Sequence, residues 1–299
     1  MPQLFPIAAI TDEFSHDIEV AAHAMAQIGM SGAELRMVFG KNIIDLTNTE
    51  LDRACEILAR HSLEIVSIAS PLLKCVLPDA PEVDARFQQD VFAATHTYAD
   101  QPRLAVRALE IAERTGARIV RVFSYWRVVR PEACFERIAR ALEHLAGQAA
   151  PHGRIIGIEN EHACNIATGQ ETARVLDAVA HPNLKVVWDP ANAYVSGEAP
   201  YPDGYGRLPV ERIAHVHAKD CRVEGHRPVW CALGEGGVDW KGQIRALAED
   251  GYKRWISLET HWAGPRGDKL EASVICGRNL KALVAAQPWV LNRFGETAP

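Results

Sequence analysis

The feature that most constrains the fold is a regular alternation of short apolar, β-branched segments with amphipathic helical patterns. From Ile10 to Glu259 the chain advances 249 residues in seven steps, or about 36 residues per unit, which is the length that one strand, one helix and two loops need. The eight strand-like segments are Ile7–Ile10, Gly32–Arg36, Ile65–Ser70, Ile119–Ser124, Ile155–Glu159, Leu184–Asp189, Ile213–His217 and Trp255–Glu259.

Helical patterns fill most of the gaps between these segments. They cover Asp17–Met30, Thr49–His61, Arg103–Thr115, Pro131–Ala149, Gln170–Ala180, Lys241–Asp250 and Leu270–Ala286. Eight units of strand then helix predict the α/β class and a parallel eight-stranded (β/α)8 TIM barrel. The alternative, an open doubly wound sheet, usually carries a glycine-rich phosphate loop after its first strand, and the segment ITDEFS found there is not such a loop.

Nothing in the sequence marks a boundary between domains. We find no linker rich in Pro, Gly or Ser, so we expect residues 1–299 to form a single domain. The longest insertion, residues 74–100, follows the third strand, where it could cover a site or simply lie on the surface. We expect the tail Pro288–Pro299 to lie over the surface or at a subunit contact.

Composition excludes several classes of protein. The net charge is −6 and no basic stripe is visible, which argues against a nucleic-acid partner. No apolar run approaches the ~18–20 residues of a membrane-spanning helix, and the N-terminus lacks the basic region of a signal peptide. The seven cysteines are scattered without a CxxC pair, which indicates reduced thiols. We therefore expect a cytoplasmic protein with no membrane partner.

Four consecutive strands each end in a residue that can bind a metal ion. Strand five ends in IGIE at Glu159, strand six in VVWD at Asp189, strand seven in HVH at His217 and strand eight in ISLE at Glu259. In a barrel of this kind, the carboxyl ends of the strands hold the active-site residues. These four side chains should therefore converge at one mouth of the barrel.

A single carboxylate at a strand end usually caps a helix or forms a salt bridge. Three carboxylates at one barrel mouth would instead repel each other unless a cation lies among them. The sequence therefore predicts one divalent metal ion bound by Glu159, Asp189, His217 and Glu259. Three oxygen ligands and one imidazole favour Mn²⁺, with Mg²⁺, Co²⁺ or Zn²⁺ as alternatives.

Neighbouring polar residues follow from strand parity. His215 lies two residues before His217, so it should sit one layer deeper as a hydrogen-bonded interior histidine. Lys219 continues the same parity and could reach the pocket. On strand two, Glu34 and Arg36 share a face, and we expect them to form an internal ion pair, with a substrate contact for Arg36 as the alternative.

At these positions the sequence resembles the xylose isomerase-like TIM barrels, a superfamily of sugar isomerases and epimerases to which endonuclease IV is related. The motifs that carry the resemblance are IGIENEH, VVWDPANAY, IAHVHAKD, LGEGGVDW and ISLETHW, together with ITDEFS and GAELR near the N-terminus. The motifs keep the family's order over nearly the whole chain. The single-metal epimerases of this family bind Mn²⁺ or a similar ion at the positions of the four residues above, and their two glutamates move protons.

The resemblance implies an isomerase or epimerase that acts on a small carbohydrate, a keto-sugar or related polyol. Glu159 and Glu259 would be the catalytic residues, one removing and the other returning a proton through a metal-stabilised enediolate. A dehydratase or lyase is the alternative, because the same intermediate can expel a β-hydroxyl if an acid such as Lys219 or His261 is near. A non-catalytic sugar-binding protein and a nuclease are weaker alternatives, since a nuclease of this family needs further histidines. We expect a homo-oligomer, a dimer or a tetramer.

The remaining substrate contacts are predicted from position alone. Besides Arg36, Lys219 and His261, we assign substrate binding to Asn192 and Trp262. Asn192 stands three residues after Asp189, where many relatives carry a histidine. An aromatic ring could give a sugar an apolar wall, and the candidates are Trp126, Trp230 and Trp262, with core or lid packing as the alternative for each.

Overall fold

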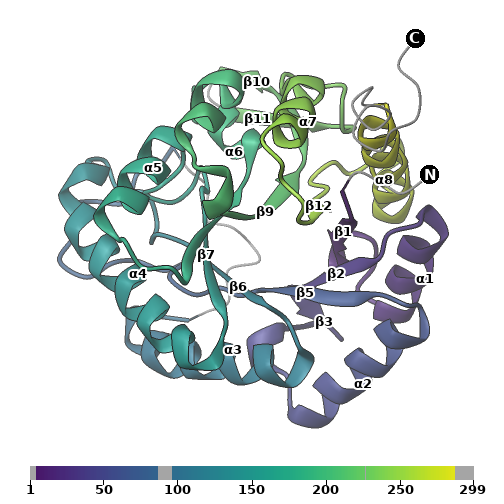
Figure 1. Ribbon diagram of the computed structural model, residues 1–299, viewed down its shortest axis with the longest axis horizontal. Coiled ribbons are helices and arrows are strands. Elements are labelled where there is room, and N and C mark those ends of the chain that lie inside the picture. The colour runs from purple at the N-terminus through teal and green to yellow at the C-terminus, as the bar shows by residue number, and fades with distance from the viewer. Residues whose placement is uncertain (1–4, 87–95, 226, 287–299) are drawn as a thin grey trace.

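The computed structural model, which describes residues 5–86, 96–225 and 227–286, contains a closed barrel of eight parallel strands (Figure 1). The barrel strands are β1 (Ile7–Ile10), β2 (Gly32–Leu35), β5 (Glu64–Ala69), β6 (Ile119–Val122), β7 (Ile155–Glu159), β8 (Leu184–Trp188), β9 (Ile213–Ala218) and β12 (Ile256–Leu258). They follow one another in chain order, and β1 closes the ring between β12 and β2. The predicted (β/α)8 TIM barrel is confirmed, and no strand boundary differs by more than two residues.

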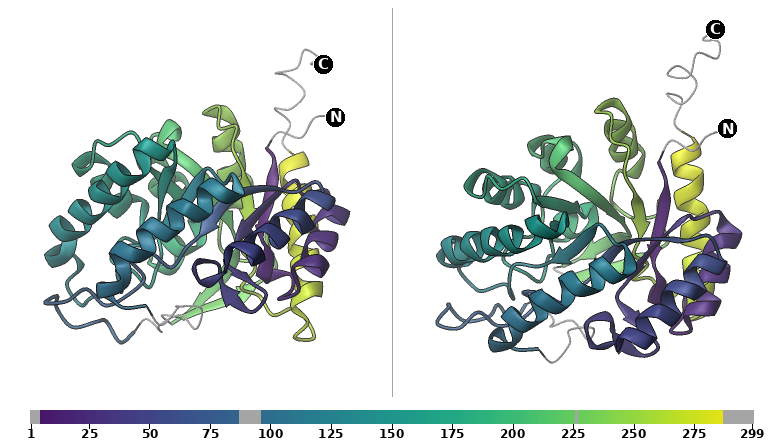
Figure 2. Two further views of the ribbon diagram at one scale, coloured as in Figure 1. Left: turned by 90° about the horizontal axis from the view of Figure 1, so that it is seen from below. Right: turned by 60° about the horizontal axis from the view of Figure 1, so that its bottom comes forward.

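Helices surround the barrel as an outer layer (Figures 1 and 2). They are α1 (Ile18–Ile28), α2 (Asn48–Arg60), α3 (Gln101–Thr115), α4 (Phe135–Ala149), α5 (Gly169–Ala178), α6 (Pro190–Val195), α7 (Trp240–Glu249) and α8 (Lys269–Ala285). Single-turn helices lie at Thr11–Glu13, Ile43–Asp45, Tyr98–Asp100, Pro131–Cys134, Ala150–His152, Pro200–Gly204, Tyr205–Arg207 and Val210–Arg212. The short helix α6, directly after β8, is the one α-helix among the described residues that the sequence pattern did not predict.

Local chemistry sets the helix ends. Helix α2 is capped by Thr47 and Glu50, which form a reciprocal capping box, so the cap lies two residues earlier than the expected start at Thr49. Gly29 and Gly116 end α1 and α3 with φ of 91° and 78°, a left-handed conformation that glycine adopts without a Cβ clash.

The barrel interior is divided into an apolar and a polar part. Three residues near the starts of their strands, Ile119, Ile155 and Ala214, pack together inside the barrel with Val187, which lies near the end of β8. Gly157 follows on β7, and a Cβ there would meet Val187 Cγ2 at 2.7 Å. Buried charged residues, among them Arg121 and Glu159, lie further along the strands, and every predicted metal ligand lies at the carboxyl end of its strand.

Two antiparallel hairpins extend from the barrel and were not predicted. They pair β3 (Met37–Val38) with β4 (Lys41–Asn42), and β10 (Asp220–Glu224) with β11 (Arg227–Cys231). Asp220 anchors the loop after the second hairpin, because its carboxylate accepts hydrogen bonds from the backbone N–H groups of Gly234, Gly236 and Val238.

Two of the expectations fall on residues that the structure does not describe. Residues 87–95 of the predicted insertion, and the tail Pro288–Pro299, lie outside the described residues. Within the described part of the chain, no helix has the length and apolarity needed to cross a membrane.

Candidate active site

The four predicted metal ligands meet at one mouth of the barrel. One ligand atom from each of Glu159, Asp189, His217 and Glu259 lies within 4.8 Å of all the others. Strand parity explains this, because each residue is the last inward-facing position of its strand or directly follows the strand. All four residues are buried, so their charges are held away from bulk water.

A lysine lies among these carboxylates. The ammonium Nζ of Lys219 is 2.8 Å from Asp189 Oδ2 and donates a hydrogen bond to Glu259 Oε2 at 2.6 Å. Despite its closeness to Lys219, Asp189 Oδ2 has no hydrogen-bond partner among the described residues, whereas Asp189 Oδ1 accepts from the backbone N–H of Asn192. The cluster therefore already contains one cation and still leaves one buried carboxylate oxygen without a hydrogen bond.

The pKa values of the residues in this cluster are shifted by burial and by the charges of their neighbours. Burial, with the nearby carboxylates of Glu259 and Glu159, raises the pKa of Asp189 to about 6. Burial would lower the pKa of Lys219, but Asp189 and Glu259 hold it well above its usual value. Burial would raise the pKa of Glu259, but the ammonium of Lys219 holds that pKa well below its usual value. The site thus contains more buried carboxylates than buried cations, and the cations stabilise the charges of the carboxylates.

The donor set fits a divalent cation. Three carboxylates and one imidazole are ligands that Mn²⁺, Mg²⁺, Co²⁺ and Zn²⁺ accept. The same assignment is supported by the mutual proximity of the four donor atoms and by Asp189 Oδ2, which has an ion pair with Lys219 but no hydrogen bond among the described residues. An ion there would compete with Lys219 for Asp189 and Glu259.

Arg36 lies at the same mouth, but its partners differ from those predicted. Its guanidinium donates to Asp12 Oδ2 at 2.8 Å and Glu13 Oε1 at 2.6 Å, and reaches Glu259 Oε1 at 3.3 Å. The expected ion pair between Glu34 and Arg36 is therefore wrong. Both side chains face inward, but residues two apart along a strand enter different layers of the barrel.

Glu34 instead contacts two histidines. Its Oε1 lies 2.8 Å from His215 Nε2 and 3.2 Å from His217 Nε2. His215 is thus a buried, hydrogen-bonded histidine one layer below the mouth, as strand parity predicts.

Arg121 on β6 is a functional candidate that sequence reasoning missed. Its Nη1 donates to Glu159 Oε2 at 2.6 Å, and both side chains are buried. The signal was present, since an arginine interrupts the apolar run IVRV at an inward-facing position. Asn192 also contacts Glu159, because its Nδ2 lies 3.4 Å from Glu159 Oε1 while its Oδ1 contacts His162.

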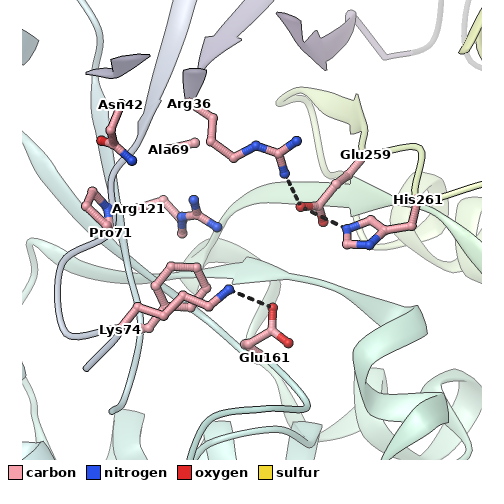
Figure 3. Close-up of a pocket in the computed structure, with 10 residues that line it drawn as sticks. Arg36, Asn42, Ala69, Pro71, Lys74, Arg121, Glu161, Glu259 and His261 are labelled. Atoms are coloured by element: carbon pink, nitrogen blue, oxygen red, sulfur yellow. Dashed lines mark hydrogen bonds and ion pairs between the residues drawn. The ribbon is translucent and has the colours of Figure 1, made fainter. Parts of the chain in front are cut away.

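A pocket opens beside the cluster and contains two of the five predicted substrate-binding residues, Arg36 and His261 (Figure 3). Its other lining residues are Asn42, Ala69, Pro71, Lys74, Arg121, Phe123, Glu161 and Glu259. Figure 3 shows Arg36 and His261 pointing toward Glu259 from opposite sides, with Lys74 facing Glu161 across the opening. Lys74, Phe123 and Glu161 were not among the predicted contacts.

The other three predicted contacts lie outside this lining. Lys219 and Asn192 are buried against the metal-ligand cluster, as described above. Trp262 is half-buried and packs against the hydrophobic core. A different tryptophan stands near the site: Trp230 on β11 has its ring 4.6 Å from that of His261, and Lys219 Nζ lies 5.6 Å from its centre.

A family model described as xylose isomerase-like TIM barrel matches residues 22–280. The protein belongs to the xylose isomerase-like TIM barrel family. The match extends from α1 into α8, so it includes the ends of all four strands that carry the candidate ligands. This confirms the family indicated by the sequence motifs.

Individual relatives of this family are distant. An inosose dehydratase from Lacticaseibacillus casei is 25% identical over 163 residues, which cover 50% of this chain and 54% of that protein. The chain thus spans about half the length of the curated relatives it matches. A solved IolI protein with a bound zinc atom has a TM-score of 0.72 and 15% identity, and the match covers 94% of this chain and 98% of that one. A D-allulose 3-epimerase from Methylomonas sp., solved with D-allulose, has a TM-score of 0.68 and 17% identity over 96% and 98% of the two chains. At these identities the structures establish the fold alone.

Proposed function

We propose that the protein is a metal-dependent lyase that dehydrates a keto-sugar or keto-polyol. The observation that carries this proposal is the 2.6 Å contact between the carboxylate of Glu259 and the ammonium of Lys219. A dehydration needs a base to take a proton and an acid to release a hydroxyl as water, and these two groups stand side by side in a buried site. The half-length match to an inosose dehydratase supports the same reaction class.

Glu159, Asp189, His217 and Glu259 would hold one divalent cation. We propose Mn²⁺ from the hard donor set, and the zinc atom of the IolI structure supports a divalent ion without selecting manganese. When bound, the ion would supply Lewis-acid polarisation of the substrate carbonyl, which makes the neighbouring C–H bond more acidic.

The protein groups would then move protons in a balanced sequence. Glu259 takes the proton from the carbon next to the carbonyl. As the C–O bond at the β-carbon breaks, the ammonium of Lys219 donates a proton to the departing hydroxyl, which leaves as water. Lys219 regains a proton from Glu259, which is within hydrogen-bond distance, and both groups return to their starting states.

The other residues would position these groups and the substrate. Arg121 holds one oxygen of Glu159 at 2.6 Å, and Arg36 contacts one oxygen of Glu259 at 3.3 Å, so each carboxylate is fixed on one side. Arg36 and His261 line the pocket and would donate hydrogen bonds to substrate oxygens. We reassign Asn192 from substrate binding to positioning of Glu159, and among the candidate tryptophans we assign the apolar wall to Trp230.

Isomerisation or epimerisation, the reaction predicted from sequence, is the second candidate. It is favoured by the presence of two carboxylates, Glu159 and Glu259, in the same four-residue cluster, since one could remove a proton and the other return one. The first step is shared with dehydration. The two functions therefore differ only in whether a hydroxyl leaves.

Solvent-exchange NMR tests this proposal and separates the two reactions. The Mn²⁺-loaded protein is incubated in D₂O with inosose and with a panel of ketoses, the ion is removed by chelation, and the products are analysed. We expect loss of water together with deuterium at the carbon that lost the hydroxyl, because the enol left by the elimination takes up a solvent deuteron there. A deuterated epimer that keeps all its hydroxyls would establish the second candidate instead. Neither exchange nor product with any compound, from protein that demonstrably holds its ion, would contradict both.

A further inference from the structure

One carboxylate lies below the proposed metal ligands and takes no part in the chemistry described so far. Glu34 on β2 is fully buried. Its Oε1 lies 2.8 Å from His215 Nε2 and 3.2 Å from His217 Nε2, and its Oε2 lies 3.4 Å from His217 Nε2. A buried carboxylate is costly unless it is paired, so these two imidazoles are what allow Glu34 to remain in the barrel interior.

The two ring nitrogens of His217 face in different directions. Nδ1 lies 3.1 Å from Glu159 Oε1 and 3.5 Å from Glu259 Oε2, and therefore faces the proposed metal ligands. Nε2 faces Glu34. A neutral imidazole that binds a cation through Nδ1 must keep its proton on Nε2, and that N–H needs an acceptor when it is buried.

We infer that Glu34 is a positioning residue that holds His217 in the Nε2–H tautomer, with the Nδ1 lone pair directed at the metal. This inference rests on the proposed metal site. Glu34 accepts the Nε2–H hydrogen bond, which fixes both the proton position and the orientation of the ring. The carboxylate contributes no atom to the ion and acts only through His217.

His215 holds Glu34 in place. Its Nδ1 has no hydrogen-bond partner among the described residues, so its single polar contact is the 2.8 Å bond from Nε2–H to Glu34 Oε1. The rings of His215 and His217 also meet edge to face, with centroids 5.5 Å apart and an interplanar angle of 85°. Two N–H donors on one oxygen leave Glu34 little freedom to turn toward another group.

A second ion held by Glu34, His215 and His217 is the competing arrangement. One donor atom from each lies within 4.8 Å of the others. However, the 2.8 Å separation of His215 Nε2 and Glu34 Oε1 is that of a direct hydrogen bond. The stoichiometry of metal binding distinguishes the two arrangements.

The test compares the full-length wild type with Glu34→Gln and Glu34→Ala. Glu161→Gln is the matched control, because it removes a buried carboxylate that lines the pocket beside the cluster and for which the structure shows no contact with His217. Circular dichroism first establishes that each variant is folded. Titration calorimetry with Mn²⁺ then gives the affinity and the number of ions per chain.

We expect one ion per wild-type chain, and binding weaker by about 10–100-fold in Glu34→Ala, the range found for outer-shell partners of metal ligands. Glu34→Gln should fall between them, since its amide oxygen can still accept a weaker hydrogen bond. Glu161→Gln should bind the ion more tightly than Glu34→Ala does.

A spectroscopic readout separates positioning from a merely structural role. In Zn²⁺-loaded protein labelled with ¹⁵N-histidine, the spectrum of His217 should show a proton on Nε2 and none on Nδ1, and Glu34→Ala should lose this pattern. An unchanged affinity and tautomer in folded Glu34→Ala would overturn the inference, and so would two ions per wild-type chain. Absence of any metal binding by the wild type would instead refute the proposed metal site.

Discussion

Replacing Lys219 with methionine probes whether this lysine and a metal ion share the same carboxylates. The ammonium lies 2.8 Å from Asp189 Oδ2 and 2.6 Å from Glu259 Oε2, and all three side chains are at most 5% exposed. Glu259 would still have Arg36 at 3.3 Å, whereas Asp189 Oδ2 would lose its ion-pair partner. Breaking a buried ion pair from one side costs about 3–5 kcal/mol, because it leaves the other charge uncompensated. We expect a loss of that size in metal-free protein.

Metal should reverse this loss. A divalent ion supplies the missing positive charge and no longer competes with an ammonium, so Lys219→Met should bind Mn²⁺ more tightly than the wild type does. Each tenfold gain in affinity adds about 1.4 kcal/mol to the stabilisation by saturating metal. The stability difference between the two proteins should therefore narrow in Mn²⁺.

Urea unfolding with EDTA and with Mn²⁺ measures both differences. Lys74→Met is the matched control, because Lys74 lines the same pocket but is 3.8 Å from Glu161 and contacts neither Asp189 nor Glu259 in the structure. Its stability difference from the wild type should be nearly the same with and without metal. If Lys219→Met is destabilised equally in EDTA and in Mn²⁺, the lysine and the ion do not share these carboxylates and the reasoning fails.

Three further predictions follow from the same geometry. Glu259→Gln should keep the fold but lower turnover by about 10²–10⁴-fold, because it removes the proposed base at nearly constant shape; near wild-type kcat would exclude that role. Elemental analysis should find no bound ion in His217→Ala, whereas His215→Ala should keep the ion. His215→Ala should mainly lose stability, because removing the imidazole leaves a cavity. The opposite metal contents would move the ligand to position 215. Gly157→Ala should lower the free energy of unfolding by about 1–3 kcal/mol, because the added Cβ would meet Val187 Cγ2 at 2.7 Å. An unchanged urea unfolding curve would show that neighbouring side chains in the barrel interior move to make room for the Cβ.

The barrel and the four converging residues could be predicted because both depend on local pattern. A strand of an eight-stranded barrel is an apolar run with a fixed inward parity, and its carboxyl end is marked by the last polar inward residue. All four candidate metal ligands follow this rule: Glu159, Asp189, His217 and Glu259. Their convergence could therefore be predicted without knowing the distances between strands.

The pairing of buried charges could not be predicted in the same way. Glu34 and Arg36 share a face, but the layers of the barrel separate them, and each finds partners on other strands or loops. Arg121 reaches Glu159 from the neighbouring strand, a contact that depends on the register between β6 and β7. Such contacts are set by the closed barrel and not by any one segment.

The pocket wall was also beyond the sequence pattern. Trp230 approaches the site because β10 and β11 form a hairpin, which was not predicted although Gly225 follows β10 directly. Trp262 follows Glu259 closely in sequence but turns toward the core. The sequence therefore named Trp230 and Trp262 as candidates but could not show that Trp230 is the one that stands beside His261.

Anomalous diffraction from crystals grown with Mn²⁺ tests the proposed metal centre most directly. We expect one anomalous peak per chain at the barrel mouth, about 2.0–2.3 Å from atoms of Glu159, Asp189, His217 and Glu259, with Lys219 Nζ displaced from Asp189. A crystal without a peak at this position, or with Lys219 still bound to Asp189 beside an ion located elsewhere, would contradict the proposed metal centre.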